Sequence, residues 1–155
     1  MSFLSTINII GSGITAQHLR LDVISENITN INTTRTADGE TGAYRRKCVV
    51  FQAETGRDTF RAAMARAAEG LAPNVGYATA GGVRVAQIAE DQTDFKLVYD
   101  PTHPDANEDG YVEMPNVDMV KEIADAMAAS QAYSANVTMF NTMKTVVTDA
   151  LQIGR

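Results

Sequence analysis

Cysteine is nearly absent from this chain, charge is missing from its beginning, and no apolar run is long. The single cysteine among 155 residues, Cys48, cannot form an internal disulfide, so it does not reveal the redox compartment. Residues 1–19 contain no Asp, Glu, Lys or Arg. Because no positive charge precedes Arg20 and glycines interrupt the apolar residues before it, we do not expect a secretory signal. We therefore expect the protein either to stay in the cytosol or to leave by a route without a cleaved signal.

The charge that is present lies in the middle of the sequence. Of the 13 Lys and Arg and 19 Asp and Glu residues, 26 fall within residues 35–125, and the net charge is -6. An acidic chain is a poor non-specific ligand for nucleic acid. The one basic cluster, residues 45–47, is typical of a solvated strand edge. The sequence thus divides into two sparsely charged ends and a water-facing middle.

Residues 119–151 predict one long helix around which the rest of the chain is organised. Between residues 126 and 148 its only charged residue is Lys144, and helices without a charged face are usually enclosed. Polar residues interrupt it too often for a membrane span of about 18 apolar residues, so its neighbours should be protein. We expect Asn116 to cap it and Asp118 and Glu122 to lie near its positive end. Its heptad-spaced stripe is Met119, Ile123, Ala126, Ser130, Tyr133, Val137, Phe140, Lys144, Val147 and Leu151.

Residues 3–31 predict a second helix with the same spacing. Its length of about 40 Å, against about 50 Å for the last helix, lets the two lie side by side as an antiparallel coiled-coil pair. Gly11 and Gly13 each cost about 1 kcal/mol relative to alanine, so we expect a neighbour to approach closely there. The apolar row, broken only at Gln17, is Phe3, Ile7, Ile10, Ile14, Leu21, Ile24, Ile28 and Ile31.

The middle of the chain predicts a small antiparallel β region. Residues 43–54 favour a strand because they are rich in β-branched and aromatic side chains. Residues 83–89 and 95–99 also show strand patterns, and the short connection between them predicts that they pair as a hairpin.

The remaining middle segments are less regular. Pro101 and Pro104 predict an irregular segment over residues 100–110, followed by a short extended piece at 111–114. Residues 56–82 fit either a short helix or a loop.

The expected fold class is α+β, with an N-terminal axial helix at 1–34, a central β-rich region at 35–115 and a C-terminal axial helix at 116–155; the two helices pack as one helical domain.

Two motifs imitate ligand sites, and neither has the required context. Residues 11–16 imitate a dinucleotide fingerprint, but the heptad row runs through them without a strand and no acidic residue follows about 20 positions later. Residues 105–110 match the first half of a calcium loop, whose twelfth position is here Asn116 in place of a bidentate carboxylate. His18 and His103 lack a metal-like spacing. We therefore expect no catalytic residue, cofactor or metal; a calcium- or nucleotide-binding module and a two-helix monomer are the competing hypotheses.

Four stretches of the sequence carry a family resemblance. Residues 12–30 contain Ser-Gly-Ile near their start and end in Asn-Ile-Thr-Asn, where Thr29 replaces a usual alanine. Residues 44–51, 100–117 and 129–154 carry the rest, and 100–117 is the most specific. Together these stretches resemble the bacterial flagellar axial family, which contains the rod subunits, the hook protein and the hook-filament junction proteins.

The resemblance implies a structural, non-enzymatic subunit of the proximal rod, which crosses the periplasm in the flagellar basal body. It implies export through the flagellar type III apparatus and torque transmission by coaxial helix packing. Partners would be copies of this chain and other rod subunits, with no nucleic acid, membrane insertion or small-molecule substrate. Another axial subunit of the same family is the alternative. The expected assembly interface consists of Phe3, Ile7, Ile10, Ile14, Leu21, Ile24, Asn27, Ile28, Asn30, Ile31, Met119, Ile123, Tyr133, Asn136, Val137, Phe140, Val147 and Leu151.

Overall fold

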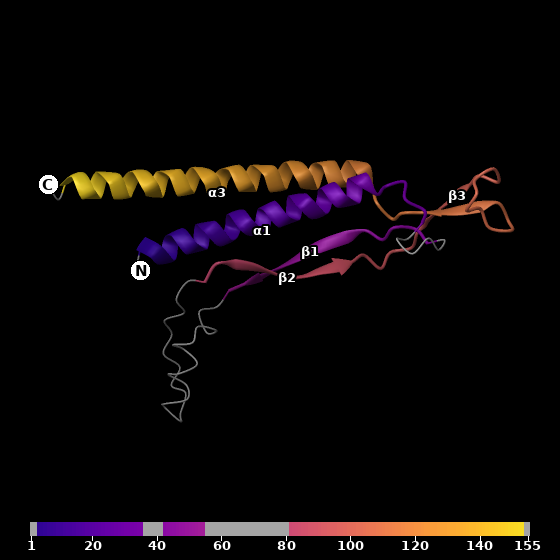
Figure 1. Ribbon diagram of the computed structural model, residues 1–155, viewed down its shortest axis with the longest axis horizontal. Helices are drawn as coiled ribbons and strands as arrows, with labels where there is room; N and C mark the ends of the chain where they lie inside the picture. Colours follow the sequence, from indigo (N-terminus) through magenta and orange to yellow (C-terminus); the bar gives the residue numbers. More distant parts are fainter. Residues whose placement is uncertain (1–2, 36–41, 55–80, 154–155) are drawn as a thin grey trace, which may run out of the picture. The chain divides into compact units, whose positions relative to one another are not determined.

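Along the chain, one long helix comes before a short β region and a second long helix follows it, as predicted (Figure 1). The structure is a computed structural model, and it describes residues 3–35, 42–54 and 81–153. The α+β class is confirmed. The elements in chain order are α1 (Phe3–Thr29), β1 (Lys47–Ala53), β2 (Val83–Glu90), β3 (Lys96–Tyr99), β4 (Tyr111–Met114) and α3 (Met119–Ile153).

The chain folds as two compact units, and both long helices contribute to each of them. β1 and β2 are also shared between the units, whereas β3 and β4 belong to unit 2 alone. The division of the sequence into residues 1–34, 35–115 and 116–155 stays a prediction. Unit 1 consists of Met1–Ala16, Phe51–Ala86 and Ala132–Arg155, and unit 2 of Gln17–Val50 and Gln87–Gln131.

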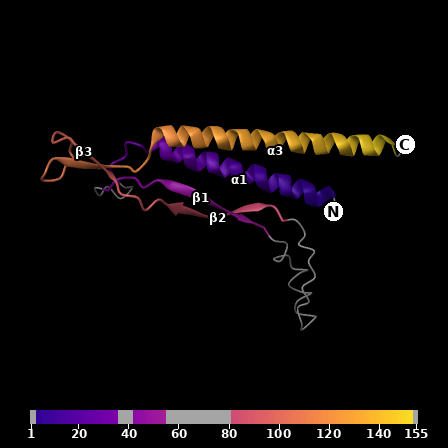
Figure 2. The ribbon, with the colours of Figure 1, turned by 180° about the vertical axis from the view of Figure 1, so that it is seen from behind.

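Within each unit, the α1 part lies beside the α3 part (Figures 1 and 2). In unit 2, Nη2 of Arg20 lies 3.2 Å from Oδ1 of Asp125, and Nδ2 of Asn27 lies 3.1 Å from Oε2 of Glu122. Residue numbers thus rise along α1 while they fall along α3, which confirms the predicted antiparallel pairing.

In unit 1, α1 lies close both to α3 and to the residue just before β2. A Cβ atom added to Gly13 would lie 3.1 Å from Nδ2 of Asn136 on α3. One added to Gly82, just before β2, would lie 1.9 Å from Oγ of Ser12. That hydroxyl oxygen accepts the backbone N–H of Val83 at 3.0 Å. The predicted close approach is therefore confirmed at Gly13, but it is wrong within the chain at Gly11, where an added Cβ would meet nothing within 4 Å.

The strands pair differently from the prediction. β1 pairs with β2 and β3 pairs with β4, so the expected hairpin between residues 83–89 and 95–99 is wrong. β3 and β4 are antiparallel, with Lys96 opposite Met114 and Tyr99 opposite Tyr111. The physical reason lies after β2: the N–H of Asp91 bonds to the carbonyl of Arg46 at 2.8 Å. The connecting segment is thereby held beside the start of β1 and does not turn β3 back onto β2.

The cap of α3 also differs from the expected residue. Oδ1 of Asp118 accepts the N–H of Val120 at 3.0 Å, and the backbone carbonyl of Asp118 accepts the N–H of Glu122 at 3.0 Å. Asp118 is thus the capping residue, whereas Asn116 bonds to other segments.

Other local expectations have mixed outcomes. Residues 100–110 are irregular and 111–114 are extended, as predicted. α1 ends at Thr29, so Ile31 lies beyond it. Most of 56–82 and the polar segment 36–41 lie outside the described residues.

The described part of the chain has a small apolar core. Within α3, only Ala129 and Glu122 are buried among the residues described. The described helices contain no 18-residue window apolar enough to cross a membrane. The buried apolar side chains are Ile10, Ala16, Val23, Ile24, Ala43, Val112, Val117 and Ala129.

The two glycines of α1 provide a matched test of helix contact. Gly13→Leu should lower the free energy of unfolding by about 1–3 kcal/mol, because the new side chain must displace Asn136. Gly11→Leu should raise it by about 0.5–1 kcal/mol, because leucine favours the helix and meets open space. Urea denaturation followed by circular dichroism measures both. Equal stability of the two variants would contradict the contact between α1 and α3 at Gly13.

Candidate functional site: a buried polar junction

Asn27, near the end of α1, is fully buried and uses the whole hydrogen-bonding capacity of its amide. Its Nδ2 donates to the carbonyl of Lys47 at 2.8 Å and to Oε2 of Glu122 at 3.1 Å. Its Oδ1 accepts the N–H of Lys47 at 2.9 Å and the hydroxyl of Tyr44 at 2.9 Å. The side chain therefore bonds to both backbone groups of Lys47, as a neighbouring strand would. It joins the end of α1 to the start of β1.

Glu122, in the first turn of α3, has a side chain that is 0% exposed. Oε1 accepts Nε–H of Arg46 at 2.6 Å, and Oε2 accepts the amide of Asn27. A buried carboxylate is costly unless it is paired and hydrogen-bonded. The N-terminal turn of a helix also favours a negative charge. Both conditions are met, so this carboxylate can occupy the interior as an anion.

Arg46, just before β1, is the cation of the site. Besides Glu122, its guanidinium lies 3.4 Å from Oδ2 of Asp125 and 3.6 Å from Oδ2 of Asp91. Burial acts to lower the pKa of Arg46, but the hydrogen bond and charge of Glu122 outweigh it, and the pKa lies above its ordinary value. Arg46 therefore stays charged. We call Asn27, Arg46 and Glu122 the Glu122 cluster.

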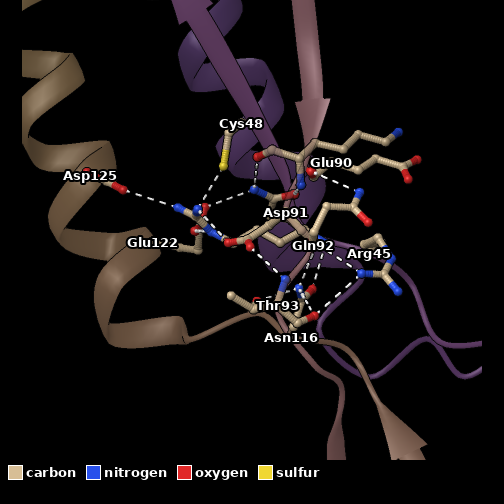
Figure 3. Close-up of polar contacts among 12 residues, drawn as sticks. Arg45, Cys48, Glu90, Asp91, Gln92, Thr93, Asn116, Glu122 and Asp125 are labelled. Carbon is tan, nitrogen blue, oxygen red and sulfur yellow. Dashed lines mark hydrogen bonds and ion pairs between the residues drawn. The ribbon is translucent and has the colours of Figure 1, made fainter.

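Asn116 extends the junction to the segment after β2 (Figure 3). Its Oδ1 accepts the N–H of Arg46 at 2.8 Å. Its Nδ2 lies 3.1 Å from the carbonyl of Asp91 and 2.9 Å from Oγ1 of Thr93. Hydrogen bonds from Thr93 hold the pKa of Asp91 below its ordinary value, with a smaller contribution from Arg46. Four segments thus meet at this point: α1, β1, the residues after β2, and the start of α3.

Cys48 also contacts the cluster, with Sγ 2.8 Å from Nη1 of Arg46. Burial raises the pKa of its thiol; the charge of Arg46 acts to lower it, but Asp91 and Glu122 add to the rise, and the pKa lies above its ordinary value. Nucleophilic cysteines need a lowered pKa, so this position does not favour thiolate chemistry. In the described ranges, no group of three or more His, Cys, Asp or Glu side chains could hold a metal ion. The geometry fits a structural junction.

A second polar junction holds the segment that imitated a calcium loop. Oδ1 of Asp105 accepts Nε–H of Arg35 at 2.8 Å, and Oδ2 accepts the hydroxyl of Thr34 at 2.8 Å. Oδ1 of Asn107 accepts the N–H groups of Asp109 and Tyr111. The oxygens that would ligate a cation therefore stabilise the chain's own turns. Likewise, α1 runs through residues 11–16 without a preceding strand, as expected.

The residues of the expected assembly interface differ in how far their side chains are exposed to solvent. Met119, Ile123, Phe140 and Leu151 are exposed on α3, while Ile10, Ile24 and Asn27 are buried within the chain. Phe3 is in α1, but its side chain lies outside the described set. Those with intermediate exposure are Ile7, Ile14, Leu21, Ile28, Asn30, Ile31, Tyr133, Asn136, Val137 and Val147.

Sequence reasoning missed Arg46 and Glu122 as partners. It took the basic residues 45–47 for a solvated edge and placed Glu122 near the helix end without a partner. The available signal was the position of Glu122 at the start of a helix with few charges, where a second charge should be nearby. Tyr44, whose hydroxyl reaches Asn27, carried no separate signal.

Family models match both helical ends of the chain. One, described as "Flagella basal body rod protein", matches residues 7–35. Another, described as "Flagellar basal body rod FlgEFG protein C-terminal", matches residues 108–153. The first covers most of α1, and the second covers β4 and α3. The two terminal helices thus have the sequence features of the basal-body rod class.

Relatives cover the whole length. The flagellar basal-body rod protein FlgC of Bacillus subtilis is 42% identical over 157 residues, which cover 100% of both chains. That of Borreliella burgdorferi is 42% identical over 99% of this chain and 98% of its own, and that of Escherichia coli O6:H1 is 40% identical over 100% of both. The chain belongs to the FlgC family of flagellar basal-body rod proteins. It is a structural rod subunit.

The Glu122 cluster predicts unequal roles for the two asparagines at the end of α1. Asn27→Ala should lower the free energy of unfolding by about 3 kcal/mol, because both backbone groups of Lys47 and Oε2 of Glu122 lose the hydrogen bonds of this buried amide. Asn30→Ala should cost under about 1 kcal/mol, since its amide bonds only locally to the carbonyl of Glu26 and to Thr33. Urea denaturation compares them. Equal losses would show that the cluster does not determine stability.

Tyr44 predicts a change in stability at high pH. Burial, followed by the charges of Glu26 and Glu122, raises its pKa from 10.0 to about 12. Its neutral phenol therefore contributes stability that is fully present below pH 10 and is lost as the pH rises through about 12. The absorbance at 295 nm of the native protein minus that of Tyr44→Phe should titrate with a midpoint near 12. A midpoint near 10 would contradict the buried hydroxyl.

Proposed function

We propose that this rod subunit belongs to the proximal rod and works there in several copies. In this proposal it leaves the cytosol through the flagellar type III export apparatus and reaches the periplasm without a cleaved signal peptide. Its neighbours are copies of itself and other rod subunits. The two long helices pack coaxially with those of the neighbours and transmit torque along the shaft.

The exposed apolar surface of α3 carries this proposal. Val120 is 77% exposed, Met127 is 69% exposed and Leu151 is 70% exposed. Met139, Phe140 and Val146 are exposed as well. These residues lie along a 35-residue helix that has one charged residue between positions 126 and 148. Exposed large apolar side chains in this number mark an interaction site, and their distribution along the helix fits burial by neighbouring helices.

Stiffness is the second requirement of a shaft. Close-packed protein interiors resist compression and transmit strain, so helices enclosed on several sides can carry torque. The junction at Glu122 supports this role, because it fixes the start of α3 to α1 and β1 through charged hydrogen bonds. We propose that the exposed members of the expected interface, Met119, Ile123, Phe140 and Leu151, contact neighbours. The buried members, such as Ile24, position the helix pair from within.

The competing ligand-binding hypotheses have little support in the geometry. The carboxylate of Asp105 is paired with Arg35, and residues 11–16 are inside a continuous helix. A monomeric two-helix domain would leave the apolar surface of α3 in water, at a cost of about 25 cal/mol for each Å² that assembly could bury. Rod assembly explains that surface and the monomer hypothesis does not.

Val146→Glu tests the proposal because Val146 is 54% exposed and its replacement disturbs no described polar contact. The free energy of unfolding of the isolated variant should lie within about 0.5 kcal/mol of that of the native protein. In an assembled rod the same glutamate would be buried without a partner, at a cost of about 3 kcal/mol or more per contact. Cells that carry only this variant should not swim, and their basal bodies should lack complete rods by electron microscopy.

The matched control is Val146→Ala, which removes apolar area without adding charge. It should retain rods and reduce swimming only slightly. Normal motility of cells with Val146→Glu as their sole copy would contradict the proposal that this face of α3 is enclosed in the rod.

A further inference from the structure

The β3–β4 pair and the loop within it, residues 96–114, form an arm that chain connections on either side join to the rest of unit 2. The connection after β4 is fixed by burial, because Pro115 is under 2% exposed and Val117 is 1% exposed. Nζ of Lys96 donates to the carbonyl of Val117 at 2.7 Å, which ties the start of β3 to the same connection. In the connection before β3, residues 91–95, the three central residues are exposed. Strands anchored by one connection could turn about it, so the other connection needs a separate support.

Arg45, two residues before β1, supplies this support (Figure 3). Its Nη1 donates to the carbonyl of Asp91 at 3.2 Å and to that of Thr93 at 3.4 Å. Its guanidinium carbon lies 4.4 Å from the centroid of the Phe95 ring, which is a cation–π contact. Nδ2 of Asn116 donates to the same two carbonyls from the other connection, at 3.1 and 3.2 Å. The base of the arm is therefore held from both sides.

The loop of the arm is tied to the chain that follows α1. Nη2 of Arg35 lies 2.7 Å from Oδ1 of Asp105, and the hydroxyl of Thr34 donates to Oδ2 of Asp105 at 2.8 Å. The hydrogen bond from Arg35, followed by that from Thr34, holds the pKa of Asp105 below its ordinary value. This carboxylate therefore stays charged at neutral pH, and the ion pair with Arg35 persists.

The residues that hold the arm lie in two short stretches between α1 and β1, residues 33–35 and 42–46, which we call the brace. The N–H of Gly42 donates to the carbonyl of Thr34 at 3.1 Å, so the two stretches are bonded to each other. A cleft of about 270 Å³ lies between the brace and the arm and is lined by residues of both. An unfilled space loses dispersion contacts, so apolar packing alone does not fix the arm. The polar contacts of the brace have to supply the rest.

We propose that the brace fixes the arm at one angle to the helices of unit 2, with Arg45 as the positioning residue at the base of the arm and Arg35 at its loop. The mechanical use of this device rests on the proposed function: a force on the arm then reaches α1 and α3 without bending the connections. Arginine suits both positions, because its planar guanidinium makes several directed hydrogen bonds and loses less entropy per bond than lysine.

Spin-label distances in the isolated, full-length chain test the inference. Nitroxides at Ser25→Cys on α1 and Glu108→Cys in the loop of the arm, both exposed positions, are placed in a Cys48→Ser background. Pulsed electron paramagnetic resonance should give one narrow distance distribution. Arg45→Ala should widen it about twofold, because the arm then samples several orientations. Arg45→Lys should widen it nearly as much, since an ammonium keeps the charge but lacks the planar fork.

An unchanged width in an Arg45→Ala chain with native circular dichroism would overturn the inference, and so would a broad distribution before that substitution. If Arg45→Ala does not fold, Phe95→Leu decides, because it keeps an apolar side chain but removes the ring beneath the guanidinium. It too should widen the distribution, and an unchanged width would overturn the inference.

Arg84→Ala is the matched control. Arg84 is an exposed arginine of β2 that bonds to Oε1 of Gln52 on β1, and it takes no part in the brace. Its loss should leave the width unchanged. Equal widening in this variant would show that the removal of any arginine loosens the chain, and would overturn the role of Arg45.

Failure of the brace and failure of the proposed function give different results. The distance distributions come from the isolated chain and do not depend on rod assembly. Rods that contain the chain, together with unchanged widths in the arginine variants, would refute the brace alone. Absence of the unmodified chain from isolated rods would instead refute the proposed function and leave the distance result as it stands.

Discussion

The fold of unit 2 depends on the buried carboxylate of Glu122. An anion at a fully enclosed position is tolerated only when hydrogen bonds and an opposite charge compensate it. Arg46 and Asn27 provide both, at 2.6 and 3.1 Å. Asn27 belongs to α1, and Arg46 lies just before β1. Both segments must therefore take one defined position against α3 for the carboxylate of Glu122 to be buried with its partners. Alternative registers would leave Glu122 without its partners, so a polar requirement selects the arrangement.

This constraint compensates for a weak apolar contact between the helices. Of the α3 residues described, Ala129 is the only apolar side chain that is buried, and alanine contributes little area. Large apolar side chains such as Val120 and Met127 point instead to solvent. Within a single chain, the apolar pattern of α3 therefore specifies its register poorly. Polar groups inside unit 2 supply that specificity, which leaves most apolar area of the helix exposed.

The sequence predicted the helices well because their signals are long and local. Heptad spacing and the absence of charge define α1 and α3 over many turns, and Gly13 indicated a close approach that the structure confirms. Strand pairing was harder, since a short connection at residues 90–93 looked like a turn. Its true partners, Arg46 and Asn116, are distant in sequence. Such a contact cannot be found from a local pattern, and the Glu122 cluster escaped prediction for the same reason.

The exposed stripe of α3 illustrates why one chain defines this fold incompletely. Heptad spacing placed Met119, Ile123 and Leu151 on the same seam as Val137, but the structure leaves those three exposed. A helix enclosed on several sides in an assembly carries several apolar stripes, and sequence periodicity cannot tell which stripe faces α1. The polar residues can, because Asn27 and Glu122 are satisfied in only one orientation. In a protein with few charges at its ends, the rare buried charge therefore distinguishes the side of the helix that makes contacts within the chain from the sides that stay exposed.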